Sequence, residues 1–301
     1  VSTVPINIGE RIVLRVLDKS KNLLQLENLG FSPKALNLFK DQLLRPYGII
    51  LVTGPTGSGK TTTLYAALNE YRDGKKNIIT IEDPIEYQIT GISQMQVKPE
   101  IGLTFATGLR SILRQDPDVI MVGEIRDEET MNIAIQSALT GHIVLSTLHT
   151  NDSISAITRL KNMGLKDYLI SSAVIGVIAQ RLIRLLCPHC KKSADTIDFN
   201  ALKKYLDKNQ NYLNLNLYSP QGCQFCNFTG YHKRTAIFEI LDIDAKIREL
   251  IINNSNADDI RKYCIESKQM QFLKDNAIAL AISGETSASE IISILSADTE
   301  I

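Results

Sequence analysis

The segment from Gly54 to Thr61 has the residue types and spacing of a phosphate-binding loop. It reads Gly-Pro-Thr-Gly-Ser-Gly-Lys-Thr and matches the pattern G-x-x-x-x-G-K-[S/T] in full. Glycines allow the backbone to curl so that successive N–H groups point at a polyphosphate, beside the positive end of a helix dipole. In such loops the lysine, here Lys60, reaches the β- and γ-phosphates, and the hydroxyl of Thr61 binds Mg²⁺. The segment therefore predicts a site for a nucleoside triphosphate and Mg²⁺.

The alternative is a glycine-rich turn that binds nothing. An apolar strand is expected before this loop and a helix after it, which is the context that the motif requires and which argues against the alternative. The residues expected to contact the nucleotide are Gly54, Pro55, Thr56, Gly57, Ser58, Gly59, Lys60, Thr61 and Thr62.

Carboxylates follow two other apolar segments. The segment 119–122 leads to Glu124. In P-loop proteins a second acidic motif occupies this place beside the metal, so we expect Glu124 to bind Mg²⁺ directly or through a water. The other segment ends in the cluster Glu82, Asp83 and Glu86, where a carboxylate is well placed to orient and deprotonate an attacking water. Both groups of acids could instead be solvated turn or cap residues.

Two histidines, His142 and His149, flank a further apolar segment. A histidine at the nucleotide end of a strand could sense a γ-phosphate by hydrogen bonding. The alternative is a structural role, which is commoner for a single histidine. Two histidines around one strand favour the functional interpretation.

Four of the five cysteines form two Cys-x-x-Cys pairs. Two such hairpins can bring four thiolates into tetrahedral geometry around Zn²⁺. The alternative, a redox dithiol, needs one pair near the start of a helix. We therefore expect a structural Zn²⁺ site made of Cys187, Cys190, Cys223 and Cys226. The remaining Cys264 is expected to be a small buried apolar side chain.

Short apolar segments alternate with helical segments through the first half of the chain. Strands are expected at 48–53, 77–82, 118–122 and 142–147, and helices at 32–44, 61–71, 104–115 and 128–139. This alternation predicts a parallel sheet with helices on both faces. Residues 151–186 are expected to be mostly helical, and 240–301 helical with caps at Ser255 and Ser287.

Four blocks of this sequence resemble the secretion ATPase superfamily of type II secretion and type IV pili. They correspond to the Walker A, Asp box, Walker B and His box of that family and are Gly54–Thr61, Ile81–Glu86, Gly123–Asp127 and Thr140–Asp152. The four cysteines resemble the module of its assembly-type members. The resemblance covers essentially the whole chain, and residues 171–182 resemble the type II secretion member better than the pilus assembly member.

The resemblance implies a RecA-like ATPase that works as a homohexamer on the cytoplasmic face of a bacterial inner membrane, with ATP, Mg²⁺ and Zn²⁺. It implies that Glu82 is the catalytic carboxylate, Glu124 the acid beside the metal and His149 a contact of the γ-phosphate. It also implies arginines that reach the nucleotide in trans or on closure, and the matching residues are Arg11, Arg15, Arg110 and Arg114. Each could instead be a surface or ion-pair arginine.

The fold class expected is α/β, with four parts. Residues 1–28 would be strands that remain of a PAS-like N-terminal domain, 29–186 a RecA-like P-loop ATPase domain, 187–238 a tetracysteine zinc insertion and 239–301 a helical C-terminal subdomain. The function implied is ATP hydrolysis that powers assembly of pilin-like subunits in type II secretion, with type IV pilus assembly as the alternative. The partners implied are an inner-membrane platform, a membrane-anchored protein with a cytoplasmic domain, and acidic lipid in a peripheral contact.

An alternative from another class is a RecA-type protein in which ATP controls affinity for nucleic acid. Such a protein needs a basic groove and stacking aromatic residues. This chain has 33 basic and 33 acidic residues and no tryptophan, and its one clustered basic and aromatic stretch is Tyr231–Arg234. We therefore expect no nucleic-acid partner.

Overall fold

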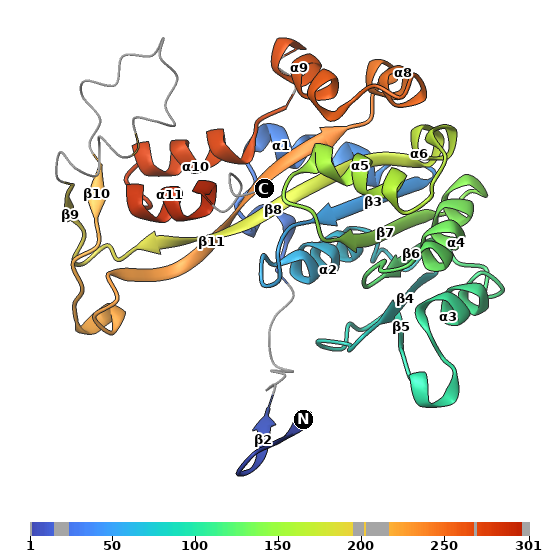
Figure 1. The fold of residues 1–301 in the computed structure, drawn as a ribbon, viewed down its shortest axis with the longest axis horizontal. Coiled ribbons are helices and arrows are strands. Elements are labelled where there is room, and N and C mark those ends of the chain that lie inside the picture. Colours follow the sequence, from blue (N-terminus) through green and yellow to red (C-terminus); the bar gives the residue numbers. More distant parts are fainter. Residues whose placement is uncertain (1, 15–23, 195–201, 203–216, 268–269, 297–301) are drawn as a thin grey trace.

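The centre of the molecule is a seven-stranded sheet (Figure 1). The computed structural model describes residues 2–14, 24–194, 202, 217–267 and 270–296. The strand order is β11-β8-β3-β7-β6-β4-β5, and all neighbours run parallel except β11, which pairs antiparallel with β8. The strands are β3 (Gly48–Thr53), β4 (Ile78–Glu82), β5 (Ser93–Gln96), β6 (Val119–Val122), β7 (Ile143–Leu148), β8 (Val174–Leu186) and β11 (Tyr231–Asp242). The α/β class predicted from the sequence is confirmed.

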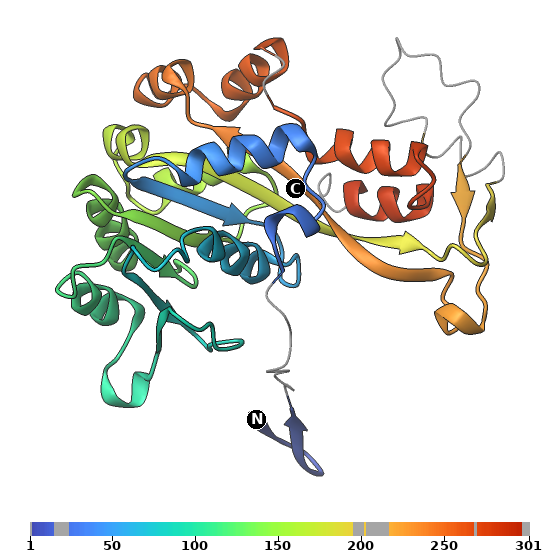
Figure 2. The ribbon, with the colours of Figure 1, turned by 180° about the vertical axis from the view of Figure 1, so that it is seen from behind.

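Helices cover both faces of this sheet (Figures 1 and 2). One face carries α3 (Phe105–Ile112), α4 (Glu128–Leu139), α5 (Ser153–Asn162) and α6 (Asp167–Ala173), and the other carries α1 (Pro33–Leu43) and α2 (Lys60–Glu70). Along β3, Ile49 and Leu51 pack toward the first group, while Ile50 and Val52 pack toward the second. A strand buried on both sides has no polar face, which explains why 48–53 is a continuous apolar run.

The helix starts follow local capping chemistry. Ser32 Oγ accepts a hydrogen bond from the Ala35 N–H at 3.3 Å, and Pro33 is the first residue of α1, as predicted. Asp127 and Asp152 accept hydrogen bonds of 2.7 Å from backbone N–H groups at the starts of α4 and α5. These two carboxylates are therefore helix caps, although they lie within the Walker B and His box blocks.

Strand β8 corrects the prediction that residues 151–186 are mostly helical. Helices α5 and α6 account for the first part, but Val174–Leu186 is a strand of 13 residues. It pairs with β3 on one side and β11 on the other, so its backbone groups are satisfied within the sheet. A long apolar run fits a buried strand and a buried helix equally well until its pairing partners are known.

The described residues after β11 form four helices: α8 (Ala245–Ile252), α9 (Ala257–Ser267), α10 (Leu273–Ile282) and α11 (Ala288–Ser296). The predicted helical character of 240–301 therefore begins only after residue 242, where β11 ends. The expected cap at Ser287 is confirmed, because its Oγ accepts from the Glu290 N–H at 3.2 Å. The Glu290 carboxylate instead binds Arg184 of β8, with a hydrogen bond of 2.9 Å from the Arg184 Nε. This ion pair joins α11 to the central sheet.

The cap expected at Ser255 was placed one residue too early. The reciprocal hydrogen bonds before α9 join Asn256 and Asp259, at 2.9 and 3.2 Å. An asparagine amide serves this role as well as a hydroxyl does, which is why the residue types alone did not distinguish the two positions.

Two small sheets and three short 3₁₀ helices complete the described chain. Strands β1 (Ser2–Ile6) and β2 (Gly9–Val13) form a separate hairpin, and β9 (Lys192–Ser193) pairs with β10 (Tyr218–Ser219). The 3₁₀ helices are η1 (Leu26–Asn28), η2 (Pro99–Ile101) and η3 (Gln224–Cys226). Strand β11 passes through residue 238, where the sequence-based division has a boundary. None of the described helices has the length and apolar character needed to cross a bilayer.

Candidate active site

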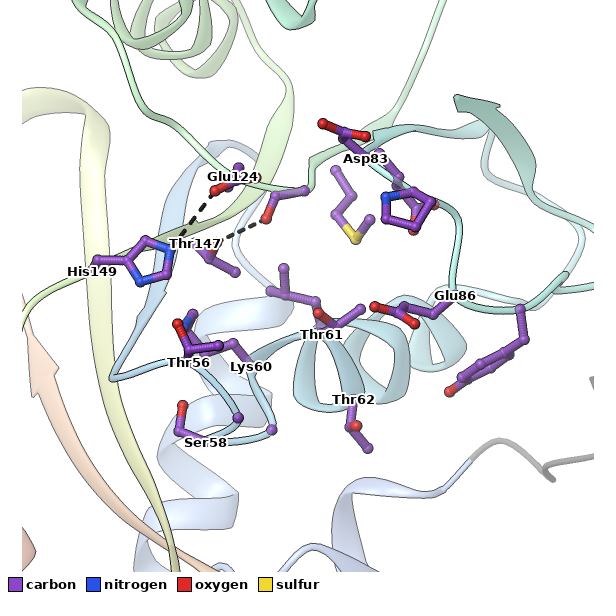
Figure 3. Close-up of a pocket in the computed structure, with 18 of the residues that line it drawn as sticks. Thr56, Ser58, Lys60, Thr61, Thr62, Asp83, Glu86, Glu124, Thr147 and His149 are labelled. Atoms are coloured by element: carbon purple, nitrogen blue, oxygen red, sulfur yellow. Dashed lines mark hydrogen bonds and ion pairs between the residues drawn. The ribbon is translucent and has the colours of Figure 1, made fainter. Parts of the chain in front are cut away.

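A cavity of about 850 Å³ lies where the parallel strands end. Its walls are the glycine-rich loop after β3, the acidic segment after β4, and the residues that follow β6 and β7. The carboxyl ends of parallel strands meet at one edge of a sheet, so segments far apart in the sequence converge there. Figure 3 shows Glu124 and His149 on one side of this cavity and the loop with Lys60 and Thr61 on the other.

The loop after β3 has backbone conformations that require glycine. Gly59 caps α2 in the left-handed region, with φ of 91°. Gly54 also has a positive φ, of 143°, and a Cβ there would collide with the backbone carbonyl oxygen of Gln180 on β8. The glycines of the motif therefore provide both the turn and the close approach to the neighbouring strand.

Lys60 begins α2 and lies across the loop. Its Nζ donates hydrogen bonds to the carbonyl oxygens of Gly54 and Pro55, at 2.7 and 3.0 Å. Burial lowers the pKa of Lys60, and the nearby Glu124 carboxylate opposes this effect. Ser58 Oγ is buried with no hydrogen-bond partner among the described residues. An unsatisfied buried hydroxyl costs about 1–3 kcal/mol, a cost that an acceptor on a ligand can remove.

Gln180 of β8 connects the phosphate-binding loop to helix α2 through two hydrogen bonds. Its Nε2 donates to the Ser58 carbonyl at 2.8 Å, and its Oε1 accepts from the Thr63 hydroxyl at 2.7 Å. One side chain thus joins the loop, helix α2 and the central sheet. Sequence reasoning missed Gln180; the available signal was a single polar residue within the apolar run 174–180.

Glu82 ends β4 and is almost completely buried, with 2% of its surface exposed. Its Oε1 accepts hydrogen bonds from Thr80 Oγ1 at 2.5 Å and Gln94 Nε2 at 3.1 Å, while Oε2 accepts from the Tyr65 hydroxyl. Burial raises the pKa of Glu82, and these hydrogen bonds lower it. The residue lines the cavity wall, and sequence reasoning missed Tyr65 and Gln94 because both belong to other elements.

Glu124 and His149 face the loop from β6 and β7 (Figure 3). Arg126 Nη2 lies 2.5 Å from Glu124 Oε1, and His149 Nε2 lies 3.7 Å from Glu124 Oε2. Burial and the Lys60 ammonium lower the pKa of His149, against the opposing effect of Glu124. Its imidazole is therefore mainly neutral at pH 7.

Oxygen donors suited to Mg²⁺ are present at this site. The Thr61 hydroxyl and the Glu124 carboxylate line the same cavity, and both are hard ligands of the kind that Mg²⁺ prefers. The residues present thus fit a magnesium–nucleotide complex.

Among the described residues, the arginines predicted to reach the nucleotide do not line this cavity. Arg110 Nη2 pairs with Glu129 Oε1 at 2.7 Å, and both side chains are about half exposed. Arg114 is exposed in the turn after α3, and its Nη2 donates a hydrogen bond to Ser111 Oγ at 3.3 Å. Arg11 is exposed in the β1–β2 hairpin, and Arg15 lies outside the described residues.

The four cysteines form a compact cluster at the far end of the β8–β11 pair (Figure 1). The Sγ atoms of Cys187 and Cys223, Cys190 and Cys226, and Cys223 and Cys226 are 3.9, 3.8 and 3.8 Å apart, and all four lie within 4.8 Å of one another. Tetrahedral zinc with bonds of about 2.3 Å needs sulfur atoms about 3.8 Å apart, whereas a disulfide needs about 2.05 Å. The cluster fits Zn²⁺.

Backbone groups also favour thiolates in this cluster. The N–H groups of Cys223 and Gly230 each point at Cys226 Sγ from 3.2 Å. The Cys187 N–H donates to the Gly230 carbonyl at 2.9 Å, which brings the two halves of the cluster together. The fifth cysteine, Cys264, is buried in α9, as predicted.

The parallel α/β sheet and the glycine-rich loop define a P-loop nucleotide-binding protein. More particularly, the chain belongs to the family described as Type II/IV secretion system protein, whose model matches residues 1–293. The resemblance noted from the sequence is thereby confirmed.

Named relatives and a solved structure support this placement. The chain is 48% identical over 294 residues to the Type II secretion system ATPase E of Vibrio cholerae, covering 98% of this chain and 58% of that protein. It is 46% identical to the Type IV pilus assembly ATPase PilB of Thermus thermophilus, covering 97% of this chain and 32% of that protein. The structure of the pilus retraction motor PilT with bound ADP superposes with a TM-score of 0.68 at 29% identity, covering 92% of this chain and 68% of that one. The chain thus spans little more than half of the Vibrio relative.

Proposed function

We propose that this chain binds ATP with Mg²⁺ in the cavity and hydrolyses it to ADP and phosphate. The observation that carries the proposal is the convergence of the loop Gly54–Thr62, Glu82 and Glu124 on one cavity. A phosphate-binding loop, a carboxylate beside the metal and a carboxylate for the attacking water are the parts that such hydrolysis needs.

The roles follow from the chemistry of each group. The loop N–H groups and Lys60 hold the phosphates, and Thr61 and Glu124 hold Mg²⁺, which when bound neutralises charge on the phosphate oxygens. Glu82 orients the attacking water and accepts its proton. Neutral His149 donates a hydrogen bond to the γ-phosphate.

The arginines act between subunits of a homohexamer. The exposed Arg110 of α3, and Arg114 just after this helix, reach a neighbour's nucleotide, and Arg11 and Arg15 approach on closure of the N-terminal segment. A guanidinium provides a planar pair of donors for developing phosphate charge, which a lysine does not. The position of Arg110 and Arg114 outside the cavity of their own chain supports a role in trans.

The motor powers assembly of pilin-like subunits in type II secretion. It works at the cytoplasmic face of the inner membrane with a membrane platform, a membrane-anchored protein and a peripheral contact with acidic lipid. The name of the Vibrio relative supports this function. Pilus assembly is the second candidate, because the Thermus relative is similar to nearly the same extent.

The cysteine cluster holds one structural Zn²⁺. The observation that supports this is the spacing of the four sulfur atoms, which matches a closed tetrahedral site. Thiolates at all four positions leave no coordination site for a substrate, so the metal stabilises the insertion and takes no part in hydrolysis.

The rate of ATP hydrolysis, measured against protein concentration, tests catalysis and assembly together. The specific activity should rise with concentration, because Arg110 completes a neighbouring site, and the variant Arg110→Ala should lose this rise. Vesicles with anionic lipid should increase the rate, and single-stranded DNA should not. A rate that is independent of concentration and stimulated by DNA in low salt would support the nucleic-acid alternative instead.

A further inference from the structure

Tyr65 contacts the candidate base from the helix that follows the phosphate-binding loop. It lies in α2, five residues after Lys60, and its side chain is completely buried. The hydroxyl donates a hydrogen bond to Glu82 Oε2 and accepts one from the backbone N–H of Glu86 at 3.3 Å. The ring packs edge-on against Tyr87, with centroids 4.7 Å apart. The phenol hydroxyl of Tyr65 therefore both donates to and accepts from the segment 82–86, which carries the proposed base Glu82.

The direction of these hydrogen bonds follows from the groups involved. A backbone N–H can only donate, so the phenol oxygen accepts from Glu86 and its single proton is left for Glu82. Thr80 and Gln94 both donate to the other carboxylate oxygen, Oε1. Oε2 receives one hydrogen bond from the described residues and keeps an acceptor position, to which a water can donate.

We propose that Tyr65 is a positioning residue for the Glu82 base and that it ties the orientation of this carboxylate to helix α2. The proposal rests on the role of Glu82 proposed above and goes beyond it by naming the side chain that selects the reacting oxygen. Helix α2 begins with Lys60, the proposed phosphate contact, and Thr61, the proposed Mg²⁺ ligand, and carries Tyr65 little more than one turn later. A single helix thus holds phosphate and base in a constant spatial relation.

Because Glu82 is buried, the hydrogen bond from Tyr65 helps to keep its carboxylate ionised. Burial, with the nearby Glu86 carboxylate, raises the pKa of Glu82, and the hydrogen bond from Tyr65 is one of three that lower it. Burial and Glu82 raise the pKa of Tyr65 above its usual range, so the phenol keeps its proton. Burial also raises the pKa of Tyr87, to about 12.

Uncharged groups also pack around Glu82. Strand β5 contributes Gln94. Gly123, after β6, lies so close that a Cβ on it would be 3.4 Å from the Glu82 Cα, and Phe105 of α3 lies beside Gly123. Titratable side chains that act on Glu82 include Tyr65, Glu86 and Tyr87, and Lys60, Asp83 and Glu124 line the same cavity.

The test is the variant Tyr65→Phe in this chain. It removes one oxygen and keeps the ring that packs on Tyr87. We expect kcat for ATP to fall by about tenfold, since a charge-assisted hydrogen bond is lost, with little change in KM. We also expect the acid limb of the kcat–pH profile to move to higher pH, because the ionised form of Glu82 loses a donor.

Tyr71→Phe is the matched control. Tyr71 is a buried tyrosine at the end of the same helix, and its hydroxyl donates to the Leu43 carbonyl at 2.5 Å, away from the cavity. This variant loses a buried hydrogen bond of the same kind and should keep the wild-type pH profile.

A second variant keeps the test valid if Tyr65→Phe folds poorly. Fluorotyrosine at position 65 retains the hydroxyl and has a more acidic phenol, so it donates more strongly. The acid limb should then move to lower pH.

Two outcomes would overturn the inference: an unmoved acid limb in both variants at position 65, or the same shift in Tyr71→Phe. The proposed function is tested separately by Glu82→Gln. If Glu82→Gln loses turnover but the acid limb of the kcat–pH profile does not move in the variants at position 65, the base assignment stands and the proposed role of Tyr65 is wrong. If Glu82→Gln keeps normal turnover, the base assignment itself is wrong.

Discussion

Replacing Cys187 with serine should remove Zn²⁺ and loosen the insertion while leaving nucleotide binding intact. A metal bound to the four cysteines would close the thirty-odd residues between Cys190 and Cys223 into a loop. Chain-entropy arithmetic for a cross-link over a loop of this length gives about 4 kcal/mol. Since single domains are stable by only about 5–15 kcal/mol in total, a loss of this size should unfold the insertion locally.

The distance to the nucleotide site explains why ATP affinity should not change. Gln180 lies in β8 and contacts the phosphate-binding loop. Cys187 lies seven residues later, just beyond the end of β8. At about 3.3 Å per residue, the separation is about 23 Å. Substitutions so far apart, with no shared partner, usually have independent effects.

The assay combines elemental analysis, limited proteolysis and titration of nucleotide binding. The wild type should contain about one zinc per chain, and Cys187→Ser should contain much less and be cut rapidly between residues 187 and 230. Cys264→Ser is the control, because it removes a buried thiol that lies outside the cluster. A wild-type protein without zinc, with four freely titratable thiols and the proteolysis pattern of the variant, would refute the reasoning.

Three further predictions concern the active site. Lys60→Ala should abolish hydrolysis with an unchanged melting temperature, because the hydrogen bonds of Lys60 go to loop carbonyls. The control is Lys40→Ala, and normal turnover in Lys60→Ala would exclude the P-loop assignment. Glu82→Gln should bind Mg²⁺–ATP and lose turnover by about 10²–10⁴-fold, whereas Glu124→Gln should lose Mg²⁺-dependent binding; the opposite pattern would exchange the two roles. Because burial raises the pKa of Glu82 above the ordinary value of 4.5, the ionised base should be lost as pH falls through that raised value, and an acid limb of kcat at or below 4.5 would contradict this.

Features that depend on neighbouring residues were predictable from the sequence. The strand Gly48–Thr53 and helix Glu128–Leu139 have the predicted bounds, since a doubly buried strand and an amphipathic helix each leave a local pattern. The phosphate-binding loop is contiguous, so its spacing alone defines its chemistry. The cysteine pairs indicate a metal site in the same way, because each hairpin is local.

Other features depend on partners that are remote in the sequence. Residues 174–186 are mostly apolar, apart from Gln180, Arg181 and Arg184, and lie in the segment predicted to be mostly helical; pairing with β3 and β11 makes them a strand. The division into domains and the roles of the site residues stay predictions. They include the roles of Arg110, exposed on α3, and Arg114, exposed just after it, which the proposal assigns to a second subunit's site.

The sequence by itself determined the class of fold, the glycine-rich loop and the two cysteine pairs, because each is encoded in local patterns along the chain. Only the tertiary structure decided what holds these groups in place: Gln180 under a loop 122 residues away from it, and Tyr65 against Glu82 across two elements. The physical reason is that a buried carboxylate or carbonyl needs a hydrogen-bond partner from whatever element packs beside it. That element is selected by the register of the sheet and the packing of helices, which no local pattern records.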